Sequence, residues 1–269
     1  MSGSPSRASR LTLRAIALGY LAALLAIPVA MVFYRTFEGG IGPALDAVTT
    51  PAAQHAFWLT CLMVAIAVPL NTIFGVGLAL GLVRGRWRGK TLVSALVDLP
   101  FAVSPVVVGL ALILVYGNSG WIGTWFAENG VRVIFSTPGM VLATIFVSLP
   151  FVVREVVPVL REIGVDQEEA ASTLGASPAQ TFWRVTLPAI RWGVAYGVIL
   201  TTARALGEFG AVAVVSGKIE GQTETMTLFV EQRFQAFDLT GAYAASVVLA
   251  LLALAVIGTM TLLDRRKEM

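Results

Sequence analysis

The sequence has few of the residues on which most catalytic and metal sites depend. Among its 269 residues there is one histidine, His55, and one cysteine, Cys61. A single cysteine cannot form an intrachain disulfide, and one His with one Cys cannot supply the ligands of a zinc site or the parts of a His-dependent triad. We therefore predict no catalytic residue and no metal site in this chain.

Charged side chains are also scarce, at 13% of the residues, whereas soluble domains carry about a quarter. Hydrophobic residues make up 57%, and the mean hydropathy is +0.80. The apolar residues lie in long runs with few charges and without the alternation that β-barrels need. These features predict an all-α integral membrane protein with six transmembrane helices, at 15–34, 56–83, 99–116, 133–153, 192–216 and 240–263.

The first run has a rival interpretation as a signal peptide. The apolar region of a signal peptide has about 7 to 15 residues, so an uncharged run over 15–34 favours a retained membrane span.

Lys and Arg are distributed unevenly between the two sets of segments that connect these runs. Four lie in the first, third and fifth loops, and fourteen lie in the N-terminal segment, the second and fourth loops and the C-terminal tail. The positive-inside rule places the second set in the cytoplasm. We expect cytoplasmic tails at 1–14 and 264–269 and a transmembrane domain over 15–263. The fourteen residues are Arg7, Arg10, Arg14, Arg84, Arg86, Arg88, Lys90, Arg154, Arg161, Arg184, Arg191, Arg265, Arg266 and Lys267.

The fourth loop contains a polar helical pattern over residues 165–188. Asp166 and Glu169 have the spacing of a capping box at the start of a helix, where the helix dipole also favours acids. Gly175 is expected to end this helix in a left-handed conformation, which costs glycine little.

A second helix is predicted directly after this turn. Ser177 is a typical N-cap residue, and Pro178 suits the first helical position. Pro188 is expected to end the helix. The pattern is therefore helix, turn, helix, with a surface of small and apolar side chains that suits docking into a groove.

Seven residues of this loop have a characteristic spacing: Glu169, Ala170, Ala171, Gly175, Val185, Leu187 and Pro188. The spacing resembles the EAA loop of bacterial ABC-importer permeases. The resemblance implies a type I ABC importer permease fold (MetI-like) with a cytoplasmic coupling helix, which inserts into a cleft of an ATP-hydrolysing subunit. The alternative interpretation is an amphipathic connector on the membrane surface.

Three segments in or beside the spans, residues 98–105, 150–155 and 204–211, resemble the sulfate and thiosulfate importer permeases, in particular their W-type subunit. The resemblance implies a multi-pass protein of the bacterial inner membrane that passes the anion from an extracytoplasmic sulfate-binding protein to the cytoplasm. It also implies a second homologous permease and two ATP-binding subunits, which use ATP and Mg, and neither a cofactor in this chain nor a nucleic-acid partner.

Two alternatives stay open. Molybdate permeases share part of 204–211, so the chain could serve molybdate or another oxyanion. An ion-gradient-driven secondary transporter could use Arg204 and Glu208 as a relay, although it would not need the coupling loop.

Prolines and polar residues interrupt several spans, and broken helices tend to line cavities. Arg204 and Glu208 form an opposite-charge pair four residues apart, at a depth where charges mark pathways or partner contacts. The candidate residues of the translocation path are Asn71, Ser104, Ser148, Arg204 and Glu208. Ordinary helix packing is the alternative role for each of them.

The second loop contains Gly89, Lys90 and Thr91, which match the end of a phosphate-binding loop. The full pattern needs a glycine where this chain has Arg84, and it needs a strand before it rather than an apolar helix. We therefore expect this chain neither to bind nucleotide there nor to be an ATPase by itself.

The fifth loop, residues 216–238, is expected to face outward. Met226, Phe229 and Phe234 would lie on an interfacial helix that contacts the binding protein or, as an equal alternative, membrane lipid.

Overall fold

The computed structural model describes residues 7–267, and within this range every regular element is a helix. Residues 1–6 and 268–269 of the two predicted tails lie outside the described part. Five segments are long and apolar enough to cross a membrane, and a sixth span results if the bent pair formed by residues 90–102 and 105–116 counts as one. The predicted all-α membrane fold is confirmed. The five segments are Leu11–Phe37, Pro51–Val83, Thr137–Glu162, Pro178–Leu206 and Leu239–Met260.

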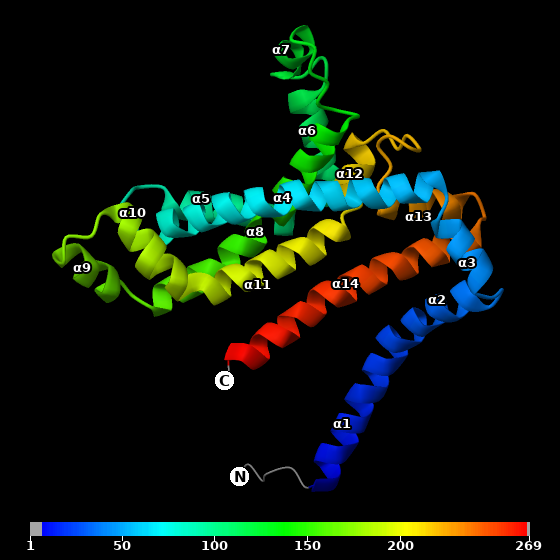
Figure 1. Cartoon of the computed structure of the whole chain (residues 1–269), viewed down its shortest axis with the longest axis horizontal. Coiled ribbons are helices and arrows are strands. Elements are labelled where there is room, and N and C mark those ends of the chain that lie inside the picture. The colour runs from blue at the N-terminus through cyan, green and yellow to red at the C-terminus, as the bar shows by residue number, and fades with distance from the viewer. Residues whose placement is uncertain (1–6, 268–269) are drawn as a thin grey trace.

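Four long helices form the body of the molecule (Figure 1), namely α4 (Pro51–Val83), α8 (Thr137–Glu162), α11 (Leu187–Leu206) and α14 (Leu239–Lys267). Glycines allow α4, α8 and α11 to approach closely. A Cβ atom on Gly75 of α4 would lie 2.7 Å from the Val152 Cβ of α8, and one on Gly197 of α11 would lie 2.9 Å from the Val152 Cα. Small residues at such contacts are typical of helix packing in membranes, where close backbone approach replaces the hydrophobic effect.

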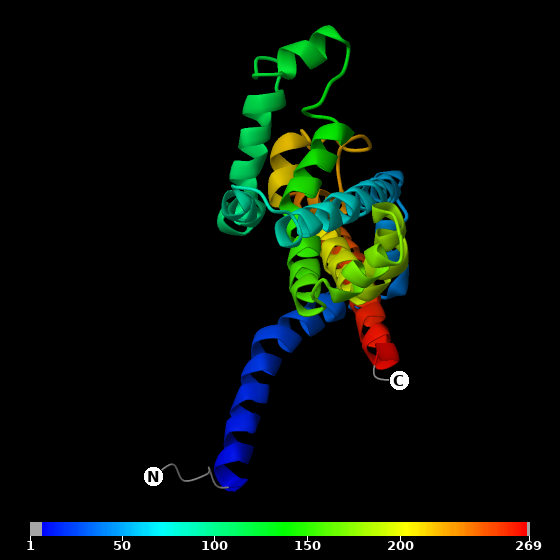
Figure 2. The same cartoon turned by 90° about the vertical axis from the view of Figure 1, so that its left-hand side faces the viewer.

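The N-terminal helices diverge from this body. They are α1 (Arg7–Leu21), the π-helical turn η1 (Ala22–Ala26), α2 (Ile27–Phe37) and α3 (Ile41–Val48). Figures 1 and 2 both show α1 pointing away from the other long helices. The first membrane span, Leu11–Phe37, has no buried residue within its most apolar window. Nearly all of the surface of this window is therefore available to lipid or to another subunit. Its helix starts at Arg7, inside the segment predicted as a tail.

The predicted third span is not one helix. α5 (Lys90–Ala102) and α6 (Pro105–Tyr116) meet at 115°, and α6 projects from the body together with α7 (Gly123–Glu128). Ser104 has ψ 134° because a residue before proline avoids the helical region. Close packing on α12 (Gly210–Val215) fixes the direction of α6, since a Cβ on Gly109 would lie 2.7 Å from the Val214 Cβ.

The predicted fifth span is also interrupted. α11 ends at Leu206, and α12 begins at Gly210, so the run over 192–216 contains a break. α13 (Met226–Gln235) follows and packs between α4 and α14. Met226 and Phe229 are buried there, with about 1% exposure each, rather than at an interface as expected. Phe234, at 58% exposure, stays on the surface.

Candidate functional site: the coupling loop and the ion pairs between helices

The first helix of the loop is α9 (Asp166–Thr173). The predicted capping box at its start is wrong, because Val165 is the N-cap residue and no side chain caps this end. Gly164, with φ +64°, turns the chain so that Asp166 already lies in the first helical turn. Asp166 and Glu169 remain near the helix N-terminus, where the dipole favours negative charge.

The end of α9 is as predicted. Gly175 has φ +87°, in the left-handed region that glycine adopts most easily. The Ala176 N–H donates to the Ala171 carbonyl (3.1 Å), and the Gly175 N–H donates to the Ser172 carbonyl (3.0 Å). These two bonds form a Schellman motif, which fixes the angle between α9 and the next helix.

The second helix begins as predicted but does not end at Pro188. Ser177 is the N-cap residue of α10 (Pro178–Thr181), and Gln180 completes a capping box that we did not predict. The helix continues through the π-helical turn η2 (Phe182–Thr186) into α11. The Leu187 N–H donates to the Phe182 carbonyl, five residues back. We attribute the tolerance of Pro188 to this widened turn, which relieves the clash of a proline ring with the preceding turn.

A groove of about 340 Å³ separates α9 from α10 and η2. Ala171, Gly175 and Val185 of the predicted coupling residues line it. Glu169 and Ala170 are exposed on α9, whereas Leu187 and Pro188 lie in the first turn of α11. The groove and an exposed apolar rim, including Leu174 at 89% and Trp183 at 66%, form a surface suited to another protein. The groove is lined by Ala171, Leu174, Gly175, Ala176, Gln180, Thr181, Arg184 and Val185.

A hydrogen-bonded network, here called the Arg84 network, attaches this loop to the body. The Arg84 Nε at the end of α4 donates to Glu168 Oε2 of α9 (2.9 Å). The same guanidinium donates to the carbonyl of Leu160 in the last turn of α8, at 3.1 Å, and to the carbonyl of Gly164, which follows that helix. Thr186 of η2 donates its hydroxyl to Glu168 Oε1 (2.9 Å). Glu168 therefore connects α9 to Arg84 of α4 and to Thr186 of η2, and Arg84 extends the network to α8.

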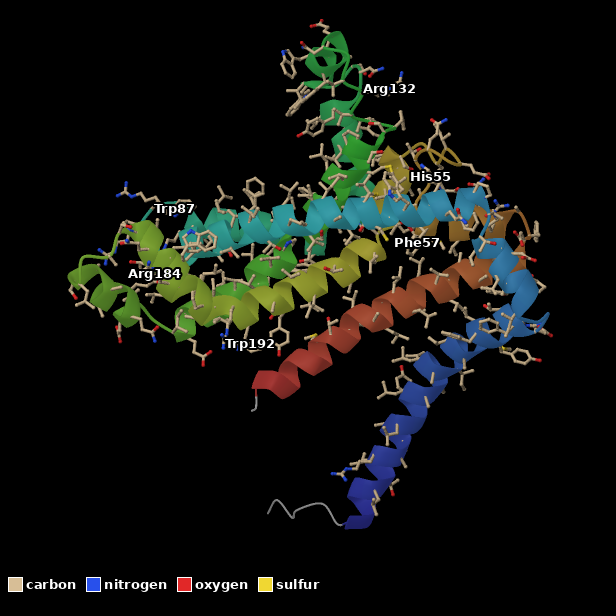
Figure 3. The ribbon with its side chains drawn as sticks, in the orientation of Figure 1. His55, Phe57, Trp87, Arg132, Arg184 and Trp192 are labelled. Carbon is tan, nitrogen blue, oxygen red and sulfur yellow. The ribbon has the colours of Figure 1, made fainter. Side chains whose placement is uncertain are left out.

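The loop, the end of α4 and the start of α5 lie at the same end of the molecule, here called the loop end. Figure 3 shows Trp87 and Arg184 there and His55 at the opposite end. We did not predict a role for Glu168, and Arg84 was expected only to contribute to the basic charge of its loop. The one available signal was the position of Arg84 directly after an uncharged run, where its side chain can reach an adjacent loop.

A second ion pair connects α5 with α8. The Arg154 Nε donates to Asp98 Oδ1 (2.7 Å), and the second guanidinium nitrogen bonds the other carboxylate oxygen. Ser104, a predicted path residue, lies beyond the end of α5 as the exposed N-cap residue of α6.

Asn71 and Ser148 meet inside the body. The Asn71 amide donates to Ser148 Oγ (2.8 Å) and to the Ile145 carbonyl (3.2 Å). Both side chains are almost fully buried, at 0% and 1% exposure. The contact joins α4 to α8, so in this conformation the two residues support helix packing, and their predicted role in the translocation path stays untested.

Arg204 and Glu208 form an ion pair at the break between α11 and α12, with Arg204 Nη1 2.7 Å from Glu208 Oε2. Glu208 follows the end of α11, so the pair does not lie on one continuous helical face as expected. Glu208 Oε1 also accepts the Ala211 N–H (3.1 Å), and the Glu208 carbonyl accepts the Thr227 hydroxyl (2.8 Å). The Glu208 side chain is 2% exposed and that of Arg204 is 29% exposed. The two residues thus connect α11, α12 and α13.

Residues 71–269 match the model of the family described as "Binding-protein-dependent transport system inner membrane component". The chain is 53% identical, over 94% of its length and 91% of the relative's, to the sulfate transport system permease protein CysW of Synechocystis sp. (strain PCC 6803). It is 40% identical, over 88% of its length and 86% of the relative's, to the sulfate transport system permease protein CysT of Synechococcus elongatus.

A solved structure has the same fold at 17% identity. It is a chain of a bacterial alginate ABC transporter in complex with an alginate pentasaccharide-bound periplasmic protein. The TM-score is 0.75, and the match covers 95% of this chain and 93% of that chain. The architecture is therefore that of an ABC-importer permease.

Proposed function

This chain belongs to the family of binding-protein-dependent transport system inner membrane components, and from this premise we propose that it is the W-type permease subunit of an ATP-driven sulfate or thiosulfate importer. The cargo rests on the 53% identity to a sulfate permease, and ATP-driven coupling rests on the 165–188 loop. The observation that carries the coupling is the Arg84 network, because it attaches an exposed loop to three helices of the membrane domain.

We propose that the loop end faces the cytoplasm and that both termini lie on that side. The uneven distribution of Lys and Arg along the sequence supports this orientation. An ATP-binding subunit that grips α9 and the groove beside it then moves Glu168. Because Glu168 bonds Arg84 and Thr186, this motion reaches α4, α8 and α11 together.

Arg204 and Glu208 are our main candidates for the path of the anion. A fixed cation attracts a divalent anion, and a carboxylate one turn away weakens that attraction so that the anion can leave. The alternative role of the pair is to hold α11, α12 and α13 together, which the bonds to Ala211 and Thr227 support. The two roles predict different behaviour of single and double variants.

The complex contains, in this proposal, a second homologous permease, two ATP-binding subunits that use ATP and Mg, and an extracytoplasmic sulfate-binding protein. The similarity to a CysT permease supports the second permease, and the structure of the alginate transporter with its periplasmic protein supports the binding protein. This chain holds no cofactor of its own in the proposal.

Reconstitution into vesicles tests the function. The chain is purified with its candidate partners, and uptake of labelled sulfate is measured with the binding protein outside and ATP inside. We expect uptake that needs ATP, persists when ion gradients are dissipated and is reduced by excess thiosulfate. Uptake that follows an ion gradient without ATP would contradict the proposal, and uptake of molybdate in place of sulfate would reassign the cargo.

A further inference from the structure

A pocket of about 380 Å³ lies between α5 and α8, with one residue from α4. It extends from the start of α5, at Lys90, to the Asp98–Arg154 ion pair, and it therefore opens near the loop end of the bundle. Its polar lining consists of Lys90, Thr91, Ser94, Asp98, Arg154 and Arg161. The remaining lining residues are apolar side chains of the three helices.

The charges in this pocket do not balance. Asp98 is the one acidic residue of the lining, and both of its oxygens bond Arg154. Lys90 and Arg161 have no ion-pair partner among the described residues. Two cations from opposite walls therefore remain unneutralised, beside the hydroxyls of Thr91 and Ser94. Such a set suits a compact dianion, since two cations match its charge and hydroxyl groups can donate to further oxygens.

We propose that this pocket binds a tetrahedral oxyanion. The ligand is either the transported dianion on its way to the cytoplasm or the phosphate of an anionic lipid headgroup, a tetrahedral oxyanion that carries one negative charge as a diester. Binding of the transported dianion rests on the proposed function, and it would make the pocket a site from which the anion leaves for the cytoplasm. Binding of the headgroup phosphate would make it a lipid site between membrane helices at the basic side of the membrane.

The pocket adjoins the Arg84 network. Arg161 directly follows Leu160, whose carbonyl accepts a hydrogen bond from Arg84. A motion of α9 that shifts the end of α8 therefore moves Arg161 relative to Lys90 on α5. An exit site built in this way releases its anion when the two cations separate.

The test measures equilibrium binding of labelled inorganic sulfate to the permease–ATPase complex, without binding protein, in nanodiscs of neutral phosphatidylcholine. Lys90→Gln and Arg161→Gln should each lower the affinity about tenfold, because each removes one cation that faces a dianion. Asp98→Asn should raise it, because it frees Arg154. Arg86→Gln and Arg88→Gln are the matched controls, since both residues are exposed on the same loop, outside the pocket, and should leave binding unchanged.

A second arm uses nanodiscs that contain phosphatidylglycerol, and native mass spectrometry counts the retained lipid. Lipid retention that falls in the Lys90 and Arg161 variants and rises in Asp98→Asn identifies the headgroup as the ligand. Sulfate binding with the same pattern identifies the free ion. The proposal is overturned if neither ligand responds or if the control variants weaken binding equally. Binding that is observed without any ATP-driven uptake by the unmodified complex would contradict the proposed function and leave the pocket standing.

Discussion

Two ion pairs in different parts of the molecule solve different structural problems. The Arg84–Glu168 pair joins residues 84 positions apart, and its side chains are 20% and 21% exposed. The Arg204–Glu208 pair joins residues four positions apart across a helix break, and Glu208 is only 2% exposed. The first pair attaches the exposed loop over residues 165–188 to the membrane helices. The second closes a discontinuity inside the body.

The difference in burial determines what the loss of each pair should cost. A buried carboxylate without its partner is an uncompensated charge, whereas a partly exposed one can still be hydrated. We therefore expect variants of the Arg204–Glu208 pair to fail chiefly in folding and assembly. Variants of the Arg84 network should fail chiefly in the transfer of motion from the ATPase.

The largest effect is expected for Arg204→Gln. It leaves Glu208 buried without its cation and should destabilise the protein by about 3 to 5 kcal/mol. The double variant with Glu208→Gln should recover most of this loss, because no unpaired charge remains. Thermal unfolding of the detergent-solubilised complex measures both. The exposed Arg35–Glu38 pair is the control, and Glu38→Gln should leave the unfolding temperature nearly unchanged.

Uptake by the same double variant separates the two roles of Arg204 and Glu208. A complex that assembles yet transports slowly supports the path role. A fully active double variant would remove both residues from the path and leave them a structural function alone.

The next effect concerns the Arg84 network. Glu168→Gln weakens two hydrogen bonds at once and leaves Arg84 without a charged partner, so a loss of about 1 to 3 kcal/mol is expected. Glu169→Gln is the matched control on the neighbouring residue, which is exposed. It should leave thermal stability unchanged and weaken only the co-purification of the ATPase. Equal stability of the two variants would contradict the role assigned to Glu168.

A change in the turn after α9 should have a smaller effect on stability, and its functional effect should be confined to the coupling loop. Gly175→Val places a β-branched residue at φ +87° and should cost about 1 to 3 kcal/mol. Gly130, at φ +73°, ends α7 with the same pair of hydrogen bonds, so Gly130→Val has a similar backbone penalty, with no atom near its Cβ position in either case. The two variants should unfold at similar temperatures, but only Gly175→Val should lose ATPase co-purification and uptake. Loss of both in Gly130→Val would show that coupling responds to stability alone.

The last effect depends on pH and lies at Glu224, in the turn before α13. Burial, and then repulsion by Glu220, raise the pKa of Glu224 from 4.5 to about 7, and Arg233 opposes the shift. Between these values the folded protein keeps a proton that the unfolded chain releases, so stability should fall as the pH rises from about 4.5 to 7. Glu224→Gln should flatten this part of the profile of unfolding temperature against pH. An unchanged slope would show that another group titrates there.

The predictable parts of the structure were those encoded locally. The apolar run ending at Val83, the left-handed Gly175 and the N-cap at Ser177 follow from patterns within a few residues, and all three are confirmed. The break near Pro105 was also visible as a proline in a span. Its 115° angle was not, because packing against α12, more than a hundred residues later, sets it.

The wrong or missed predictions concern features that residues outside the local pattern determine. Pro188 ends a helix by local rules, but a π-helical turn before it lets the helix continue. Glu169 was favoured as a capping residue, and the adjacent Glu168 was overlooked because its partner Arg84 lies on another loop. Long-range pairs of this kind leave no periodic signal in a single sequence.

ATP-driven uptake by Glu168→Gln tests the central claim most directly, that the Arg84 network carries the motion of the ATPase to the membrane helices. The variant complex is reconstituted with saturating binding protein, and sulfate uptake is measured beside the amount of bound ATPase and its rate of ATP hydrolysis. The account predicts that the ATPase stays bound and hydrolyses ATP while uptake falls at least tenfold. Uptake equal to that of the unmodified complex would contradict it.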